Sequence, residues 1–318
     1  MILTVTPNPC IDKTLFVEEL RIGEKIRAPR YSCITGGKGC NVSRALKVMG
    51  GDTKAMLLVG GATGQHALQM LEEQDQVKTL PVWVAEQTRT ITTVLEEGVH
   101  RQTAFFEPGP RVTEAERLRF LTAFETHAAQ AALITFNGSA PDPALDLLYR
   151  DLLECAHALK VPVILDAYGA IFTHALEQVP FMIKPNLEEL ELFVGQRLDT
   201  RAKQWRAIDT LRQRGISWVV LSLGAEGALI AGEDGCFHAV PPAIQEINAV
   251  GSGDALVAGF ALGLTQNCST EDTARLGIAM GTANAASWDI CSFTKEAVEH
   301  LIPQIRLIPR DSCVYPEN

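Results

Sequence analysis

The stretch AALITFNGSAPDPALDLLYRDLLECAHALKVPVILDA, residues 131–167, contains one complete strand–helix–strand unit. It begins with a short apolar run, AALITFNG (131–138), that is bounded by turn residues. A longer segment of helical period follows, PALDLLYRDLLECAHAL (143–159), and a second apolar run, VPVILDA (161–167), closes the unit. Strand, helix and strand in this order form a right-handed βαβ unit on a parallel sheet.

The same alternation continues in both directions along the chain, from about residue 36 to 75 and from about 113 to 222. TKAMLLVGG (53–61) leads to QHALQMLEEQ (65–74), FMIKPN (181–186) leads to LEELELFVG (187–195), and SWVVLSLG (217–224) closes the series. From about residue 252 the chain returns to helices. The pattern predicts an α/β fold with a mainly parallel central sheet. In such sheets, ligands bind beyond the carboxyl ends of the strands.

Two stretches, about 12–33 and 82–107, contain strand-like runs without helices between them. Without helices to cover both faces, these strands are expected to form a small separate sheet that acts as a lid.

Composition excludes several classes of function. The chain has 318 residues, 47% of them hydrophobic, and a formal net charge of -10. Because Lys and Arg do not cluster, we expect no nucleic-acid partner. No apolar run reaches the ~20 residues of a membrane span, and no basic leader precedes the first apolar run. The eight cysteines include no CxxC pair, which is typical of small core residues in a reducing cytoplasm.

The first candidate site is GSGD, residues 251–254. Glycines let a ligand approach the backbone closely, and the N–H groups of a helix that starts near Ser252 would bind an anion. Asp254 in that first turn either complements the helix dipole or accepts a proton from a substrate hydroxyl while a phosphoryl group is transferred.

Two further motifs are ambiguous by themselves. TGGKGCNVSRAL (35–46) is rich in glycine and opens a helix, but Gly39 follows Lys38, so it is not a Walker A loop. It could be a flexible turn with a solvated lysine. In KPNLEEL (184–190), Asn186 and Glu189 form either a capping pair or a contact to a metal-bound water and a phosphate.

Taken in order, five motifs resemble the PfkB/ribokinase family of sugar kinases, in its hexose-phosphate branch, over residues 1 to about 300. They are TPNP-x-x-D (6–12), GGKG-x-N (36–41), KPN-x-x-E (184–189), SLGAEGA (222–228) and VGSGD (250–254). The resemblance implies a single kinase domain over 1–318, with a ribokinase-like three-layer fold, a small β-sheet lid, and dependence on ATP and Mg²⁺.

The resemblance also implies a role for each matching residue. Asp254 would be the catalytic base, and Gly251, Ser252 and Gly253 the anion hole. Lys38 and Arg89 would bind the phosphate already on the sugar. Glu189 would act on Mg²⁺ through water. The other residues that would bind the sugar phosphate are Asp12, Lys25, Gly37, Asn41 and Ser139, and those that would line the nucleotide are Lys184, Asn186, Glu189, Ser222, Gly224, Gly227 and Asn284.

Several substrates remain open. Lys38 in GGKG resembles the 1-phosphofructokinase and tagatose-6-phosphate kinase branch, which makes fructose 1-phosphate the first choice. GGATGQH (60–66) and Lys25 resemble the minor 6-phosphofructokinases instead. Ala249 and Asn137 depart from the family pattern, as does the absence of an arginine four residues before Pro108. A non-catalytic sugar-phosphate sensor is a further alternative. Open lid edges and the resemblance together favour a homodimer that is joined through the lids, in the reducing cytoplasm that the cysteines indicate.

Overall fold

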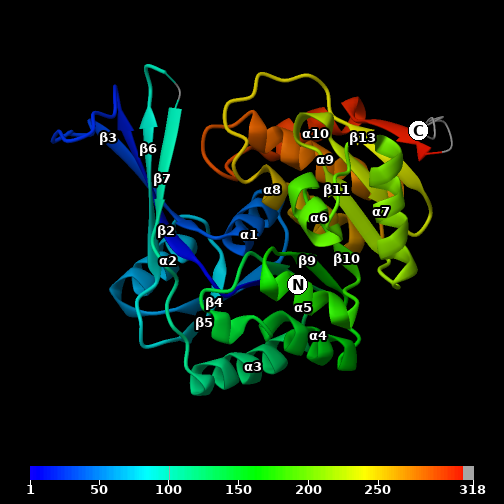
Figure 1. The fold of residues 1–318 in the computed structure, drawn as a ribbon, viewed down its shortest axis with the longest axis horizontal. Coiled ribbons are helices and arrows are strands. Elements are labelled where there is room, and N and C mark those ends of the chain that lie inside the picture. The colour runs from blue at the N-terminus through cyan, green and yellow to red at the C-terminus, as the bar shows by residue number, and fades with distance from the viewer. Residues whose placement is uncertain (100, 311–318) are drawn as a thin grey trace.

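The computed structural model describes residues 1–99 and 101–310, so residue 100 of the predicted lid and residues 311–318 of the predicted domain lie outside the described residues. Its main feature is a ten-stranded sheet with the order β14-β13-β12-β11-β10-β9-β8-β1-β4-β5 (Figure 1). The strands are β1 (Ile2–Thr6), β4 (Thr53–Val59), β5 (Lys78–Trp83), β8 (Leu133–Asn137), β9 (Val163–Asp166), β10 (Met182–Ile183), β11 (Trp218–Ser222), β12 (Ala228–Ala231), β13 (Cys236–Val240) and β14 (Arg306–Pro309).

The strands from β5 to β11 pair in parallel, as the alternation of strands and helices predicts. β1 and β8 are buried along their whole length. Continuous burial is expected for a parallel strand that helices cover on both faces.

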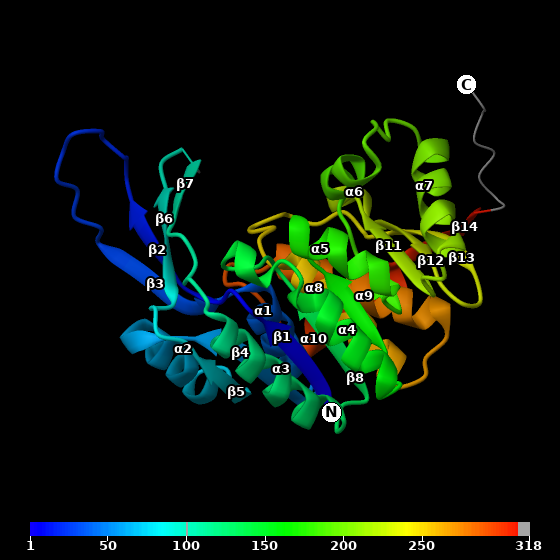
Figure 2. The ribbon, with the colours of Figure 1, turned by 60° about the horizontal axis from the view of Figure 1, so that its bottom comes forward.

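Helices pack on both faces of the large sheet and produce three layers (Figure 2). One face carries α3 (Glu114–Ala128), α4 (Leu148–Ala158), α5 (Ala170–Ala175), α6 (Leu187–Val194) and α7 (Arg201–Gln213). The other carries α1 (Lys38–Val48), α2 (Gly61–Glu73), α8 (Ser252–Thr265), α9 (Thr270–Ala285) and α10 (Lys295–Leu301). Short 3₁₀ turns are η1 (Pro143–Leu145), η2 (Leu176–Gln178), η3 (Gly224–Glu226) and η4 (Ile302–Gln304). The predicted α/β fold is confirmed.

One part of the large sheet was not predicted. β12, β13 and β14 extend it beyond β11 in antiparallel order. β14 lies after the last helices, in a region where the sequence predicts only helices. β14 is short, and it forms a strand because it pairs with β13, which is about 70 residues earlier in the chain. Local periodicity therefore does not predict this strand.

The predicted separate sheet is present, with slightly different bounds. It has the order β3-β2-β6-β7, with strands β2 (Cys10–Val17), β3 (Arg30–Gly36), β6 (Arg89–Glu96) and β7 (Arg101–Phe106). Val82 and Trp83 belong to β5 of the large sheet, because they continue its parallel register against β4. The small sheet stands away from the large one in both ribbon views (Figures 1 and 2). We call it the lid sheet.

No helix of the described residues is long and apolar enough to span a membrane. The seven cysteines that the structure describes are all free, and three of them, Cys10, Cys40 and Cys291, are buried. Cys313 lies outside the described residues.

Candidate active site

Most of the predicted site residues lie where the parallel strands end and two helices begin. α1 starts directly after Gly37, and α8 starts directly after Gly251. These two helices pack against each other although they are far apart in the sequence (Figure 1). β9 ends at Asp166 beside them, and Lys184 follows the end of β10. This is the edge at which ligands of parallel sheets bind.

A buried carboxylate joins two of the predicted lysines. Asp166 Oδ1 accepts a hydrogen bond from Lys38 Nζ at 3.0 Å and pairs with Lys184 Nζ at 3.2 Å. Burial by itself would raise the pKa of Asp166, but the ammonium groups of Lys184 and Lys38 outweigh burial and hold that pKa below its ordinary value. Burial opposes the charge of Lys38 as well, yet Asp166, Asp254 and Glu189 together raise the pKa of Lys38. Lys38 is therefore cationic.

These contacts bear on the role of Lys38, which stays a prediction. The resemblance implies that Lys38 binds the phosphate already on the sugar. In the structure its Nζ lies between Asp166 and Glu189, 3.9 Å from Glu189 Oε1. The hydrogen bond to Asp166 and the contact with Glu189 fix the position of the Lys38 ammonium. Its position beside Asp166 and Glu189 favours a role at the group being transferred.

Asp254 lies in the first turn of α8 with only 6% of its surface exposed. Asn41 Nδ2 donates a hydrogen bond to Asp254 Oδ2 at 2.7 Å. Burial, and then repulsion from Asp166, raise the pKa of Asp254 to about 6, although Lys38, Asn41 and Lys184 oppose the increase. A carboxylate with a pKa this close to neutrality is suited to general-base catalysis, because it is ionised at pH 7 yet basic enough to accept a proton.

The start of α8 has the geometry of an anion site. Gly251 has φ +85°, and a Cβ atom there would lie 2.4 Å from Ile290 Cγ2, so glycine is required. Ser252 N–H already donates to Ala249 O at 3.1 Å. The donors left for a ligand at this terminus are therefore the N–H groups of Gly253 and Asp254. Lys184 adds positive charge, since its Nζ would lie 3.4 Å from a Cβ atom on Gly253.

The side chain of Asn284 holds this loop in place by hydrogen bonds. Its Nδ2 donates to Val250 O at 2.8 Å and to Ser252 Oγ at 2.9 Å, and its Oδ1 accepts from Cys291 N at 2.7 Å. The side chain is buried and its polar atoms are all used within the protein. The implied contact with the nucleotide stays a prediction, and in the structure the side chain holds the loop of the anion site.

The capping interpretation of Asn186 and Glu189 is confirmed, and their contact with a metal-bound water and a phosphate stays a prediction. Asn186 Oδ1 accepts from Glu189 N at 2.8 Å, and Glu189 Oε2 accepts from Asn186 N at 2.9 Å, which is a complete capping box. The other carboxylate oxygen of Glu189, Oε1, points toward Lys38. One oxygen thus caps α6 and the second faces the site.

The implied nucleotide residues Ser222, Gly224 and Gly227 surround η3, directly after β11. Ser222 donates through its backbone N–H and its hydroxyl to Pro185 O, at 3.0 Å and 3.3 Å. This pair of bonds ties the turn to the strand end that carries Lys184. Gly227 is required by packing, because a Cβ atom there would lie 2.0 Å from Ala239 O. Gly224 has open space on its outer side.

A second polar group lies where the lid sheet joins the large sheet. Arg89 Nη2 donates to Asn8 O at 3.4 Å, and Asn8 Nδ2 donates to Ser139 Oγ at 3.4 Å. Both contacts are long. Arg89 Nε is buried without a hydrogen-bond partner, and no carboxylate of residues 1–99 or 101–310 forms an ion pair with Arg89. An unpaired guanidinium in a protein of net charge -10 is a strong candidate for binding an anion.

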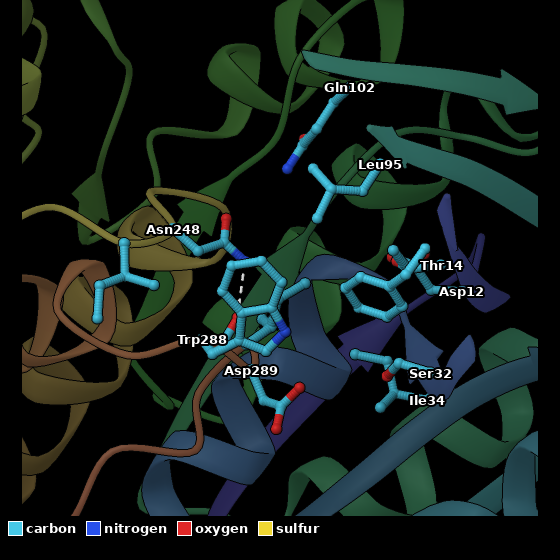
Figure 3. A pocket seen from close by; sticks show the side chains of 12 residues that line it. Asp12, Thr14, Ser32, Ile34, Leu95, Gln102, Asn248, Trp288 and Asp289 are labelled. Atoms are coloured by element: carbon cyan, nitrogen blue, oxygen red, sulfur yellow. Dashed lines mark hydrogen bonds between the residues drawn. The ribbon is translucent and has the colours of Figure 1, made fainter. Parts of the chain in front are cut away.

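A cavity of about 140 Å³ separates the lid sheet from the loops around α8 and α9 (Figure 3). Asp12 and Thr14 line it from β2, and Asn248 and Trp288 line it from the opposite side. Burial raises the pKa of Asp12, and Arg44 partly offsets this. The ring centroids of Phe16 and Trp288 lie 5.8 Å apart, so the lid contacts the body of the molecule next to the cavity.

Lys25 is not brought into this group. It lies in the exposed connection between β2 and β3, beyond the ends of both strands, and none of its contacts joins it to the other implied sugar-phosphate residues within the described chain. The connection that contains it extends beyond the ends of β2 and β3 (Figure 2).

The arrangement fits a magnesium ion that arrives with a nucleotide. Among the described residues no group of three or more His, Cys, Asp or Glu could hold a metal by itself. Asp166 Oδ2, however, is buried without a hydrogen-bond partner, and Glu189 Oε1 faces the same lysine as Asp166. Mg²⁺ commonly binds one or two carboxylates together with waters and substrate phosphates, and these two oxygens suit that mode.

Sequence reasoning missed two members of the site. Asp166 ends the buried strand VILD, and a carboxylate at the carboxyl end of a parallel strand is a signal that could have identified it. Asn8 lies inside the motif TPNP-x-x-D, but only the fold shows that it connects Arg89 with Ser139.

Comparison with known proteins agrees with this geometry. The chain is 34% identical over 304 residues to the ATP-dependent 6-phosphofructokinase isozyme 2 of Mycobacterium tuberculosis, covering 94% of this chain and 88% of the relative. It is 31% identical over 307 residues to the 1-phosphofructokinase of Bacillus subtilis, covering 96% and 99%.

A solved structure of the tetrameric inhibited form of phosphofructokinase-2 from Escherichia coli superposes with a TM-score of 0.88 at 27% identity, covering 95% of this chain and 98% of that one. This similarity confirms the ribokinase-like fold class. The model of the pfkB family of carbohydrate kinases matches residues 6–289. The chain therefore belongs to the pfkB carbohydrate kinase family, and it is a sugar-phosphate kinase of the phosphofructokinase type.

Proposed function

We propose that the protein transfers the terminal phosphoryl group of ATP to fructose 1-phosphate and releases fructose 1,6-bisphosphate. The observation that carries the proposal is the buried Asp254, whose pKa is raised to about 6, in the first turn of a helix whose free N–H groups form an anion site. A base next to an anion site is what transfer from a phosphate to a hydroxyl requires.

Asp254 accepts the proton of the attacking hydroxyl as the new oxygen–phosphorus bond forms. The bond from the terminal phosphorus to its bridging oxygen breaks, and its electron pair leaves on ADP. The N–H groups of Gly253 and Asp254, together with Lys38 and Lys184, stabilise the negative charge on the transferred group. Asp166, and Glu189 through a water, would hold Mg²⁺, which would supply positive charge beside the nucleotide phosphates.

Arg89 binds the phosphate that the sugar already carries, with Ser139 beside it. The support is the unpaired state of its guanidinium and the contact chain from Arg89 through Asn8 to Ser139. Asp12 lines the cavity under the lid and holds a sugar hydroxyl. Ser222 and Gly224 line the nucleotide at the turn after β11.

Fructose 6-phosphate is the second candidate substrate. The relative from Mycobacterium tuberculosis is named a 6-phosphofructokinase, and its 34% identity is slightly above the 31% of the Bacillus subtilis 1-phosphofructokinase. Tagatose 6-phosphate is a third candidate, which rests on the resemblance of GGKG alone.

The test is a coupled ADP-release assay with ATP and Mg²⁺ on fructose 1-phosphate, fructose 6-phosphate, tagatose 6-phosphate and fructose. The highest kcat/KM is expected for fructose 1-phosphate. Asp254→Asn keeps the shape of the site but removes the base, so kcat should fall by ~10²–10⁴ while sugar-phosphate binding persists. Binding without turnover in the wild type would support a non-catalytic sensor instead, and a preference for fructose 6-phosphate would select the second candidate.

A further inference from the structure

Arg44 is a buried arginine on α1 that belongs to none of the five motifs' implied roles. Its Nε and Nη2 donate to the two carboxylate oxygens of Asp75 at 2.9 Å and 2.7 Å. Nη2 also donates to Thr35 O at 3.0 Å. With 7% of its surface exposed, Arg44 is held in a single orientation by a bidentate ion pair and a backbone acceptor.

The third nitrogen of the Arg44 guanidinium, Nη1, contacts the residue that is hydrogen-bonded to Asp254. Arg44 Nη1 donates to Asn41 Oδ1 at 2.9 Å, and Asn41 Nδ2 donates to Asp254 Oδ2 at 2.7 Å. An amide has an acceptor end and a donor end. Because Arg44 can only donate, it binds the oxygen of Asn41 and leaves the N–H₂ group facing Asp254. Without Arg44, the amide could rotate and present its oxygen to the carboxylate.

We propose that Arg44 is a positioning residue that, anchored by Asp75, orients the Asn41 amide so that its N–H holds the Asp254 carboxylate ready to accept the substrate proton. The inference rests on the proposed function, because it needs Asp254 to be the base. It adds a chain of contacts, Asp75 to Arg44 to Asn41 to Asp254, through which a residue remote from the substrate controls the base.

Other charged and titratable groups also interact with Asp254. Asp166 lies at the end of β9, Lys38 on α1, and Lys184 after β10. The thiols of Cys40 and Cys291 also interact electrostatically with Asp254, and burial raises the pKa of each. The hydrogen bond from Asn41 lowers the pKa of Asp254. Loss of that bond should therefore move the acidic limb of the activity profile to higher pH.

Arg44→Lys is the most informative variant. It keeps a positive charge beside Asp75, but an ammonium lacks the planar set of N–H donors that bonds to Asp75 and Asn41 at the same time. On the preferred sugar phosphate, kcat should fall about tenfold at pH 6.5 and return to within about twofold of wild type at pH 9, where Asp254 is ionised in either protein. KM should change little. Arg310→Lys is the matched control, because Arg310, directly after β14, also forms a two-point pair, with Asp209 on α7.

A double-mutant cycle tests the route through Asn41. If Arg44 acts through Asn41, adding Arg44→Lys to Asn41→Leu should change kcat by less than about twofold. The inference would be overturned if the losses in kcat of the two single variants multiply in the double variant. It would also be overturned if Arg44→Lys lowers kcat equally at all pH values. Wild-type kinetics in Arg44→Lys while Asp254→Asn is inactive would overturn it as well. Full activity in Asp254→Asn would instead remove the proposed function itself.

Discussion

At the residue scale, Asp254 combines a functional charge with an unfavourable environment. Burial and the neighbouring Asp166 disfavour its ionised form, and the two lysines compensate for only part of that cost. A catalytic carboxylate that is poised near neutrality therefore destabilises the fold whenever it is ionised.

This cost predicts a pH-dependent stability difference for Asp254→Asn. Asp254 has a pKa of about 6 when folded, against an ordinary value of 3.8, so wild type loses stability as the pH rises through this window. The neutral variant does not lose it. Asp254→Asn should melt roughly 2–6 °C above wild type at pH 8 and at nearly the same temperature at pH 4. Calorimetry at both pH values measures this, and equal melting temperatures at pH 8 would contradict it.

Lys38 and Arg89 should now differ in their effects on substrates. Arg89→Ala removes the cation that we assign to the resident phosphate, so kcat/KM on fructose 1-phosphate should fall roughly 10- to 150-fold, while the poor rate on fructose stays unchanged. Lys38→Met should lower both rates, because Lys38 contacts Asp166 and Glu189 beside the transferred group.

Steady-state kinetics on the two sugars separates these outcomes. Arg275→Ala is the control, since Arg275 pairs only with Glu271 and Asp272 on α9 among the described residues. Equal losses of Arg89→Ala on both sugars would remove Arg89 from the phosphate site.

At the element scale, the start of α8 depends on one glycine. Gly251 combines φ +85° with close contact to Ile290, and Asn284 holds the two residues that flank it. The helix N-terminus is thereby fixed before any anion binds. Preorganised donors of this kind are among the largest contributions to catalysis.

Gly251→Ala should therefore affect catalysis as well as stability. A β-carbon in this backbone region costs about 1–2 kcal/mol, which lowers the melting temperature by a few °C. Gly195→Ala carries the same backbone penalty at φ +68° but meets nothing within 4 Å. Gly251→Ala should lose more stability than Gly195→Ala, because its β-carbon also meets Ile290, and kcat should fall at least about tenfold only for Gly251→Ala. Wild-type kcat in Gly251→Ala would show that the loop is not organised as described.

At the scale of the whole molecule, the lid sheet has two open edges, β3 and β7, and exposed aromatic side chains. Tyr31, Phe105 and Phe106 are all exposed on these strands. Open edges and exposed apolar surface are normally covered in proteins.

We predict a homodimer that is joined through the lid sheets. Light scattering at micromolar concentration should give twice the chain mass of 34.6 kDa. Phe106→Asp should weaken the dimer because it places a charge in the expected interface. Leu192→Asp is the matched control, since Leu192 is an exposed apolar residue on α6, away from the lid. A wild-type monomer, or equal effects of the two variants, would contradict the prediction.

Much of this architecture could be predicted from the sequence because its signals are local. Strand and helix periods predict the parallel sheet and its covering helices, and the absence of helices predicts the lid. The five motifs predict where Asp254, Lys38 and Glu189 belong. β14 and the ends of the lid strands could not be predicted, because these strands are defined by the strands they pair with and not by their own residues.

The sequence by itself therefore determined the α/β fold, the separate lid sheet and the set of chemical groups in the site. Only the tertiary structure decided which groups act on one another. Asn41 and Asp254 are 213 residues apart, and Lys38 and Asp166 are 128 apart. Whether such side chains meet, and which end of an amide faces a carboxylate, depends on how strand ends and helix starts converge. That convergence is set by packing across the whole sheet, which no local pattern of residues contains.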